Sequence, residues 1–215
     1  QASESGLVYT PTEISALSRV AKGNGLSIHM DGARFANAVA SQQVTPAELS
    51  WKAGVDVLCL GATKCGALCA EVVIFFNKEL AKTFTHRRKR GGHLLSKGRV
   101  FGAQMVGWLQ DDHWLELAKH ANTQAVKLAE TINGIDGLQL VWPVESNELF
   151  VVMPKGLATY LRDAGAEFYD WYADTLPPNV TLQDDQQFAR LVTSFATQDS
   201  HRQEFSELIR GYFIS

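Results

Sequence analysis

Two short apolar runs, each leading to a charged residue, limit what this chain can fold into more than any other feature. The first run leads to Asp31 and a glycine, and the second leads to Lys64, which lies between two glycines. Apolar runs of this length are typical of buried strands. In an α/β sheet the carboxyl ends of such strands meet at one crevice, where ligands bind. We therefore expect Asp31 and Lys64 to lie at the same edge of a sheet.

This acid and this lysine have both a structural and a functional interpretation. Asp-Gly pairs most often form turns, and a lysine between glycines is most often a solvated loop residue. The functional interpretation is a site for pyridoxal phosphate. Lys64 would form the Schiff base, and the carboxylate of Asp31 would keep the pyridine nitrogen protonated. A converging acid and lysine are the minimum that this cofactor needs.

The order of the surrounding elements indicates an α/β fold. The capping-box signal Thr-Pro-Thr-Glu at residues 10–13 begins a helix, and a similar signal at residues 45–48 predicts a second helix that ends at Gly54. Strands are expected near residues 55–60 and 71–76. Their connection is too short for a parallel crossover, so this pair should be antiparallel within a mostly parallel sheet.

The second half of the chain reads as helices followed by a small α/β unit. Residues 100–109 predict a buried helix, and residues 112–134 predict a long amphipathic one. We place the domain boundary here, with a partial cofactor-binding large domain over residues 1–112 and a small C-terminal α/β domain over residues 113–215. The small domain is expected to contain strands near residues 138–141, 149–153, 168–171 and 190–193, and helices near residues 157–164 and 200–213.

Composition excludes several classes of partner. The chain has 215 residues, 46% of them hydrophobic, and a net charge of -3. This balance gives no reason to expect nucleic acid or an anionic membrane as partner, and no apolar run approaches the length of a membrane span. The basic run at residues 86–90 is interpreted as a solvated loop. Nothing at the N-terminus resembles a signal peptide, so a cytoplasmic location is the default.

The cysteines do not predict a metal site. Cys59, Cys65 and Cys69 are clustered, but their spacing fits no common zinc pattern. An odd number of cysteines in a cytoplasmic protein indicates reduced thiols. Cys65 lies beside Lys64 and is a candidate reactive thiol, to which we assign no role.

Several segments, in order along the chain, resemble the threonine aldolases. This family belongs to the β-eliminating-lyase branch of the fold type I pyridoxal-phosphate enzymes, and the resemblance is strongest to its bacterial low-specificity type. The similar segments are residues 29–38, which contain the aspartate, 61–66, which contain the lysine, 70–76, 87–97, 148–151 and 189–193.

The resemblance implies roles for individual residues. Lys64 would form the Schiff base, and Asp31 would bond to the ring nitrogen of the cofactor. Arg34 would contact the cofactor's phenolate oxygen and the substrate carboxylate, and Thr63 would contribute to cofactor binding. Arg190 would bind the α-carboxylate of the amino acid, a geometry that suits a guanidinium.

The resemblance also implies an assembly. The resemblance implies a homotetramer whose sites are shared between subunits. The basic segment around Lys97 would then reach the cofactor phosphate of a neighbouring subunit. The family's N-terminal part, which supplies a ring-stacking aromatic group and a phosphate-binding loop, has no counterpart in this sequence. We therefore expect a C-terminal fragment, with a separate N-terminal fragment as a possible partner.

The implied activity is the cleavage of β-hydroxy-α-amino acids. Threonine or allo-threonine would give glycine and acetaldehyde. Two alternatives stay open. One is another pyridoxal-phosphate lyase, such as a phenylserine aldolase or a β-eliminating lyase. The other is a catalytically incomplete fragment.

Overall fold

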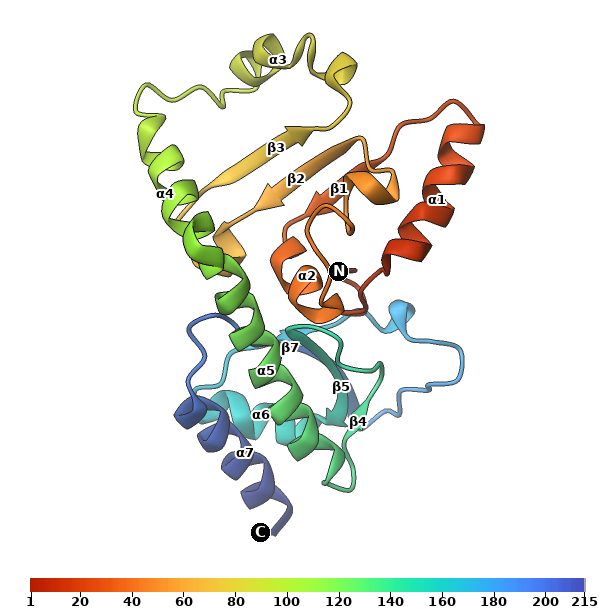
Figure 1. The fold of residues 1–215 in the computed structure, drawn as a ribbon. Helices are drawn as coiled ribbons and strands as arrows, with labels where there is room; N and C mark the ends of the chain where they lie inside the picture. Colours follow the sequence, from red (N-terminus) through yellow and green to blue (C-terminus); the bar gives the residue numbers. More distant parts are fainter. Residues whose placement is uncertain (215) are drawn as a thin grey trace. The chain divides into compact units, whose positions relative to one another are not determined.

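The computed structural model describes residues 1–214, which form two compact units. The N-terminal unit is Tyr9–Ala118. The C-terminal unit combines Gln1–Val8 with the chain from Lys119 onward. The division falls inside the long helix α5 (His113–Asn133), whereas the sequence analysis placed the boundary just before that helix. The α/β class predicted from the sequence is confirmed (Figure 1).

The N-terminal unit contains a three-stranded mixed sheet in the order β1 (His29–Gly32), β2 (Val57–Gly61), β3 (Glu71–Phe75). β1 pairs with β2 in parallel, and β2 pairs with β3 in the antiparallel sense that the short connection predicted. Figure 1 shows the three strands side by side. The sheet thus has one parallel and one antiparallel pair, where the sequence predicted a mostly parallel sheet.

The first helix begins where its capping signal predicted. α1 (Pro11–Gly23) has Thr10 as its N-cap, whose hydroxyl oxygen accepts a hydrogen bond from the Glu13 N–H at 3.2 Å. The Glu13 carboxylate in turn accepts one from the Thr10 N–H at 2.8 Å. The capping box is therefore complete, and it satisfies two donors that a helix start otherwise leaves unpaired.

Replacing Thr10 with alanine is expected to lower the free energy of unfolding by about 1 kcal/mol, because the N-cap acceptor is lost. Urea unfolding followed by circular dichroism measures this change. Thr12→Ala is the matched control: Thr12 is exposed inside the same helix, so its removal should be neutral or slightly stabilising. Equal midpoints for Thr10→Ala and the unchanged protein would contradict the prediction.

The second helix predicted from a capping signal does not form. The bonds between Thr45 and Glu48 are present, with the Thr45 N–H donating to the carboxylate at 2.8 Å. They are followed by turns and a single 3₁₀ turn, η1 (Trp51–Ala53), and not by an α-helix. The Ser50 hydroxyl donates to the Pro46 carbonyl at 2.6 Å, while the Ser50 N–H bonds elsewhere. This local side-chain bond replaces a helical one.

The remaining helices of the unit include one that departs from expectation. α4 (Arg99–Leu109) coincides with the helix predicted at residues 100–109, but of its side chains only Trp108 is buried, and Val100 and Val106 are exposed. The prediction of a buried helix is therefore wrong for the described chain. The other elements are α2 (Phe35–Gln42), η2 (Thr63–Cys65), η3 (Lys78–Ala81), α3 (Phe84–Arg90), α4 (Arg99–Leu109) and η4 (Gln110–Asp112).

The C-terminal unit is built on an antiparallel sheet. Its order is β4 (Gln139–Leu140), β5 (Glu148–Pro154), β7 (Gln186–Val192), β6 (Tyr169–Asp170). The helices are α5, α6 (Lys155–Asp163) and α7 (Asp199–Ile214), with a 3₁₀ turn, η5 (Ala173–Thr175). All four strands and both later helices predicted from the sequence are present, although β7 begins at Gln186, before its predicted start.

The two faces of this sheet have different cores. Leu149, Val151 and Met153 of β5 pack with residues of α5, α6 and α7. The alternate residue Phe150 packs in a separate aromatic cluster with Phe188, Trp142 and Trp171. Because every residue of β5 up to Met153 is buried, both faces are covered.

Among the helices of residues 1–214, none combines the length and the apolar character needed to cross a membrane.

Candidate functional site

Asp31 lies at the carboxyl end of β1. Its carboxylate accepts a hydrogen bond from the Ala33 N–H at 3.0 Å, which forms the turn expected of an Asp-Gly pair, and its side chain is exposed. The next residue is Gly32, and the space around it leaves no room for a side chain. A Cβ atom there would lie 2.5 Å from the carbonyl oxygen of Cys59 in the neighbouring strand.

Lys64 lies in η2, directly after β2. Since β1 and β2 run in parallel, Asp31 and Lys64 follow the same edge of the sheet, as the sequence predicted. The two connections also touch: a Cβ atom at Gly61 would lie 2.8 Å from the Cα atom of Ala33. The side chain of Lys64 is exposed, so its amine is accessible to a ligand at this edge.

The loop that carries Lys64 is anchored by buried tryptophans. The carbonyl oxygen of Cys65 accepts a hydrogen bond from the indole N–H of Trp108 at 2.7 Å. The thiol of Cys65 donates to the carbonyl oxygen of Trp114 at 3.5 Å, and the two indole rings lie 5.3 Å apart. These contacts bury Cys65 while Lys64, its neighbour, stays exposed. The lysine therefore projects from a fixed backbone.

Cys65 is too buried to be a reactive thiol. Burial raises its pKa to about 11 from 9.0, and the residue is only 3% exposed. The thiol therefore stays protonated at neutral pH, when a nucleophile would need the thiolate.

At neutral pH an alkylating reagent is expected to label the exposed Cys69 in the native protein and to leave Cys65 unmodified until denaturation. Peptide mass spectrometry measures both sites in one sample. Above a pH of about 9 the unfolded chain loses the Cys65 proton first, because the native pKa is the higher one. The free energy of unfolding therefore falls as pH rises between these two pKa values. Equal labelling rates at the two cysteines would contradict the prediction.

A histidine–cysteine contact lies beside Asp31. The Nε2 atom of His29 is 3.2 Å from the sulfur of Cys59, the residue paired with Asp31 in the sheet register. Burial, with a smaller contribution from the charges of Asp31 and Glu71, raises the pKa of the Cys59 thiol. His29 is thus a neighbour of the candidate site, and it lies on the same strand face as Asp31 because the two residues are two positions apart in β1.

The other residues predicted for this part of the site are spread over three elements. Arg34 is the half-buried N-cap residue of α2, directly after the Asp31 turn. Thr63 is exposed and begins η2, next to Lys64. Lys97 is exposed in the turn before α4. In the described chain, no hydrogen bond or ion pair joins Lys97 to Asp31 or Lys64. The structure therefore groups Arg34 and Thr63 with the Asp31–Lys64 edge but not Lys97.

Arg190 belongs to the C-terminal unit. It lies in β7, opposite Phe150 and Tyr169, and its side chain is 16% exposed. Its guanidinium carbon lies 4.2 Å from the centre of the Trp171 ring. Its Nη1 atom lies 3.4 Å from a carboxylate oxygen of Glu148, whose side chain is fully buried. Neither of these two partners of Arg190 was predicted from the sequence.

A signal for these partners exists in the sequence. Glu148 is a charged residue at the start of an otherwise apolar strand, which is where a buried carboxylate needs a cation. Trp171 follows the short strand that pairs with Arg190. Neither residue could be assigned to Arg190 without the strand register.

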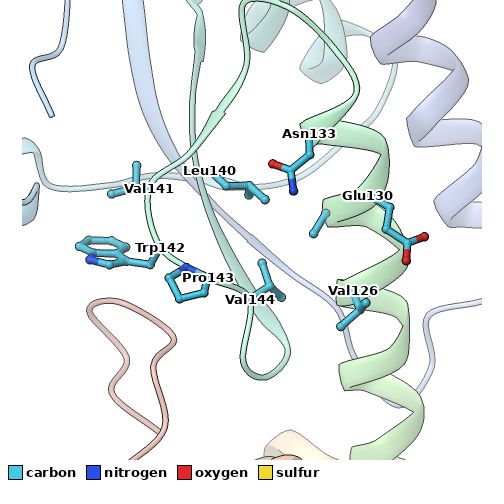
Figure 2. Close-up of a pocket in the computed structure, with 9 residues that line it drawn as sticks. Val126, Glu130, Asn133, Leu140, Val141, Trp142, Pro143 and Val144 are labelled. Carbon is cyan, nitrogen blue, oxygen red and sulfur yellow. The ribbon is translucent and has the colours of Figure 1, made fainter.

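A surface groove in the C-terminal unit is separate from the predicted residues. Its volume is about 530 Å³, and it lies between α5 and residues 140–144. Figure 2 shows Val126, Glu130 and Asn133 of α5 on one side and Trp142 and Pro143 on the other. The groove contains none of the candidate site residues.

Asp31, Lys64 and the sheet edge on which they lie fall within a segment that matches a known family. The family of beta-eliminating lyases matches residues 1–155. The chain belongs to this family. The whole of β7, including Arg190, lies outside the match.

Individual members of the beta-eliminating lyase family are similar over more of the chain. A low specificity L-threonine aldolase of Pseudomonas aeruginosa is 48% identical over 81% of this chain and 50% of its own length. A second, from a Pseudomonas species, is 42% identical over 98% of this chain and 58% of its own length. The chain thus spans about half the length of the curated relatives it matches.

Solved structures share the fold. A threonine aldolase of Leishmania major has a TM-score of 0.85 and 30% identity, and the match covers 95% of this chain and 57% of that one. An α-aminoadipate aminotransferase of Thermus thermophilus, solved with a phosphopyridoxyl-leucine, has a TM-score of 0.61 at 12% identity, covering 94% of this chain and 55% of that one. The second likeness shows the fold alone. The chain therefore shares the fold type I architecture of these structural neighbours.

Proposed function

We propose that this chain carries the cofactor-binding lysine of a pyridoxal-phosphate aldolase that cleaves β-hydroxy-α-amino acids to glycine and an aldehyde. Threonine and allo-threonine are the proposed substrates. The observation that carries the proposal is the position of Asp31 and Lys64 at one edge of a parallel strand pair. The names of the relatives point to the same reaction.

The residues at this edge fit the cofactor. The carboxylate of Asp31 is exposed and oriented by the Ala33 N–H, so it can accept a hydrogen bond from a protonated ring nitrogen. The amine of Lys64 is exposed on an anchored loop and can bond covalently to an aldehyde. Arg34 and Thr63 adjoin these two residues and are the proposed additional contacts. When bound, the cofactor supplies the electron sink for cleavage next to an amino group.

Arg190 and Arg34 are the proposed ligands of the substrate carboxylate. Guanidinium groups suit this role because their donors match the two carboxylate oxygens. Arg190 is held in a largely buried position on an aromatic ring, which favours one orientation of its donors.

Further parts of the proposal follow from the family. We propose that the N-terminal unit is part of the large cofactor-binding domain and that the C-terminal unit is the small domain. We also propose a homotetramer in the cytoplasm, in which Lys97 reaches the cofactor phosphate of another subunit. The exposed position of Lys97 is compatible with such a contact. Size-exclusion chromatography with light scattering tests the tetramer.

Product analysis tests the reaction. The protein is incubated with pyridoxal phosphate and a panel of threonine, allo-threonine, phenylserine and serine, and the products are identified by chromatography. Glycine and acetaldehyde from threonine support the proposal. Glycine and benzaldehyde from phenylserine alone would indicate a phenylserine aldolase, and a keto acid with ammonia would indicate β-elimination.

A catalytically incomplete fragment is the second candidate, favoured by the chain's coverage of about half of its relatives. In that case neither a visible cofactor band nor any product would form with this polypeptide alone. Mass spectrometry of the preparation for an additional N-terminal polypeptide then separates an isolated fragment from a cleaved but complete enzyme.

A further inference from the structure

Arg190 contacts several side chains of the C-terminal unit, beyond what binding a carboxylate requires. Arg190 lies on the face of β7 that carries the aromatic cluster of Phe150, Phe188 and Trp171. The strand register places Phe150 on one side of Arg190 and Tyr169 on the other. A cationic side chain is thus enclosed by rings, in a part of the unit away from the helix-covered face.

The indole ring of Trp171 lies against the guanidinium of Arg190. The guanidinium carbon lies 4.2 Å from the centre of the Trp171 ring and 5.7 Å from that of Tyr169. At the shorter distance the cation interacts with the face of the indole, the most favourable aromatic partner for such a contact. A large ring this close restricts rotation of the arginine side chain, which limits the directions in which its donors can point.

Glu148 forms an ion pair with one end of the guanidinium, the Nη1 atom. Its carboxylate oxygen lies 3.4 Å from Nη1 of Arg190, and its other oxygen accepts a hydrogen bond from the Gln1 amide at 2.6 Å. The Glu148 side chain is fully buried, so it cannot turn into solvent. Nη1 is therefore committed to a partner within the protein.

The Nε donor of Arg190 is not used within the described chain. Nε of Arg190 is buried and has no hydrogen-bond partner within residues 1–214. Nε and Nη2 lie on the edge remote from Nη1, and their parallel N–H bonds match the two oxygens of a carboxylate. A buried donor without a partner is unusual in proteins and points to a missing acceptor.

We propose that Trp171 and Glu148 are positioning residues that present the Nε–Nη2 edge of Arg190 to the α-carboxylate of the amino-acid substrate. The inference rests on the proposed function and deepens it. It assigns the carboxylate to one edge of the guanidinium and names the two side chains that select this edge. Neither Trp171 nor Glu148 contacts the substrate in this arrangement.

The decisive experiment compares two ligands that differ only in the carboxylate. Dissociation constants of glycine and glycinamide are measured with the cofactor-loaded protein by the change in its visible spectrum. Trp171→Leu is expected to weaken glycine binding about tenfold and to leave glycinamide binding unchanged. Trp171→Phe keeps a ring under the guanidinium and should restore most of the affinity. In an Arg190→Lys background, Trp171→Leu should add no further loss.

Glu148→Gln gives the second arm, because it keeps the shape of the side chain and removes its charge. It too should weaken glycine binding and spare glycinamide. Equal weakening of both ligands by Trp171→Leu, or additive losses with Arg190→Lys, would overturn the inference and leave the proposed function standing. Absence of any cofactor band in the unchanged protein would instead refute the proposed function, and the inference with it.

A readout without the cofactor accompanies these measurements. The Nε–H resonance of Arg190, assigned by its loss in Arg190→Lys, should lie upfield because of the Trp171 ring and should move in Trp171→Leu. Slow rotation about the Nε–Cζ bond in the unchanged protein, and fast rotation in Glu148→Gln, are expected. Fast rotation in both proteins would contradict positioning by Glu148.

Discussion

The Lys64→Ala variant is expected to lose the visible absorbance band that the protein forms with added pyridoxal phosphate. It should also lose aldol cleavage by a factor of about 10³ or more, since the covalent attachment of the cofactor depends on this amine. Absorbance spectra and glycine release, measured on the same preparations, give both results. A band of undiminished intensity in Lys64→Ala would show that another lysine binds the cofactor.

Removing the Lys64 side chain is not expected to disturb the fold. The fold of the Lys64 loop depends on Cys65, through its contacts with Trp108 and Trp114, and not on the lysine side chain. The variant should therefore fold with an unchanged thermal midpoint. Lys78→Ala, at an exposed position in η3, is the matched control and should keep both the band and the activity.

Gly32→Ala is expected to lower the free energy of unfolding by about 3 kcal/mol, because overpacked interiors must shift side chains or backbone to make room. The added Cβ atom would lie 2.5 Å from the Cys59 carbonyl oxygen and 2.7 Å from Leu58. Backbone cannot give way there without separating β1 from β2. Chemical denaturation measures the change, and it should be accompanied by weaker cofactor binding because the Asp31 turn moves.

The chain contains a suitable control for the added methyl group. Gly102 lies inside α4, and a Cβ atom there would meet nothing within 4 Å. Gly102→Ala should therefore stabilise the protein by about 0.5–1 kcal/mol through helix propensity. If both alanine variants had the same stability, the close approach of β1 and β2 at Gly32 would be refuted.

Local signals in the sequence were enough for most of the backbone. The capping box at Thr10 begins a real helix because the residues after it have an unbroken helical pattern. The same signal at Thr45 fails because Ser50 competes for a helical acceptor, a contact that a capping rule does not consider. The exposure of α4 also escaped prediction, since apolar composition says nothing about which neighbour covers a helix.

The candidate site also contains some residues that the sequence could predict and others that it could not. Asp31 and Lys64 could be predicted because the first lies at the carboxyl end of β1 and the second just after β2, and parallel strands end at one edge. The partners of Arg190 could not, because Trp171 and Glu148 meet it only through pairing of three separate strands. Long-range register depends on the packing of both sheet faces, which no short motif encodes.

The contacts of Gln1–Val8 give the C-terminal unit a particular folding problem. The Ser146 hydroxyl donates to the Gly6 carbonyl at 3.0 Å, and the Val8 N–H donates to Glu145 at 2.7 Å. These partners are separated by about 140 residues of sequence. Because synthesis proceeds from the N-terminal to the C-terminal side, residues 1–8 cannot make these contacts until the whole intervening unit has left the ribosome.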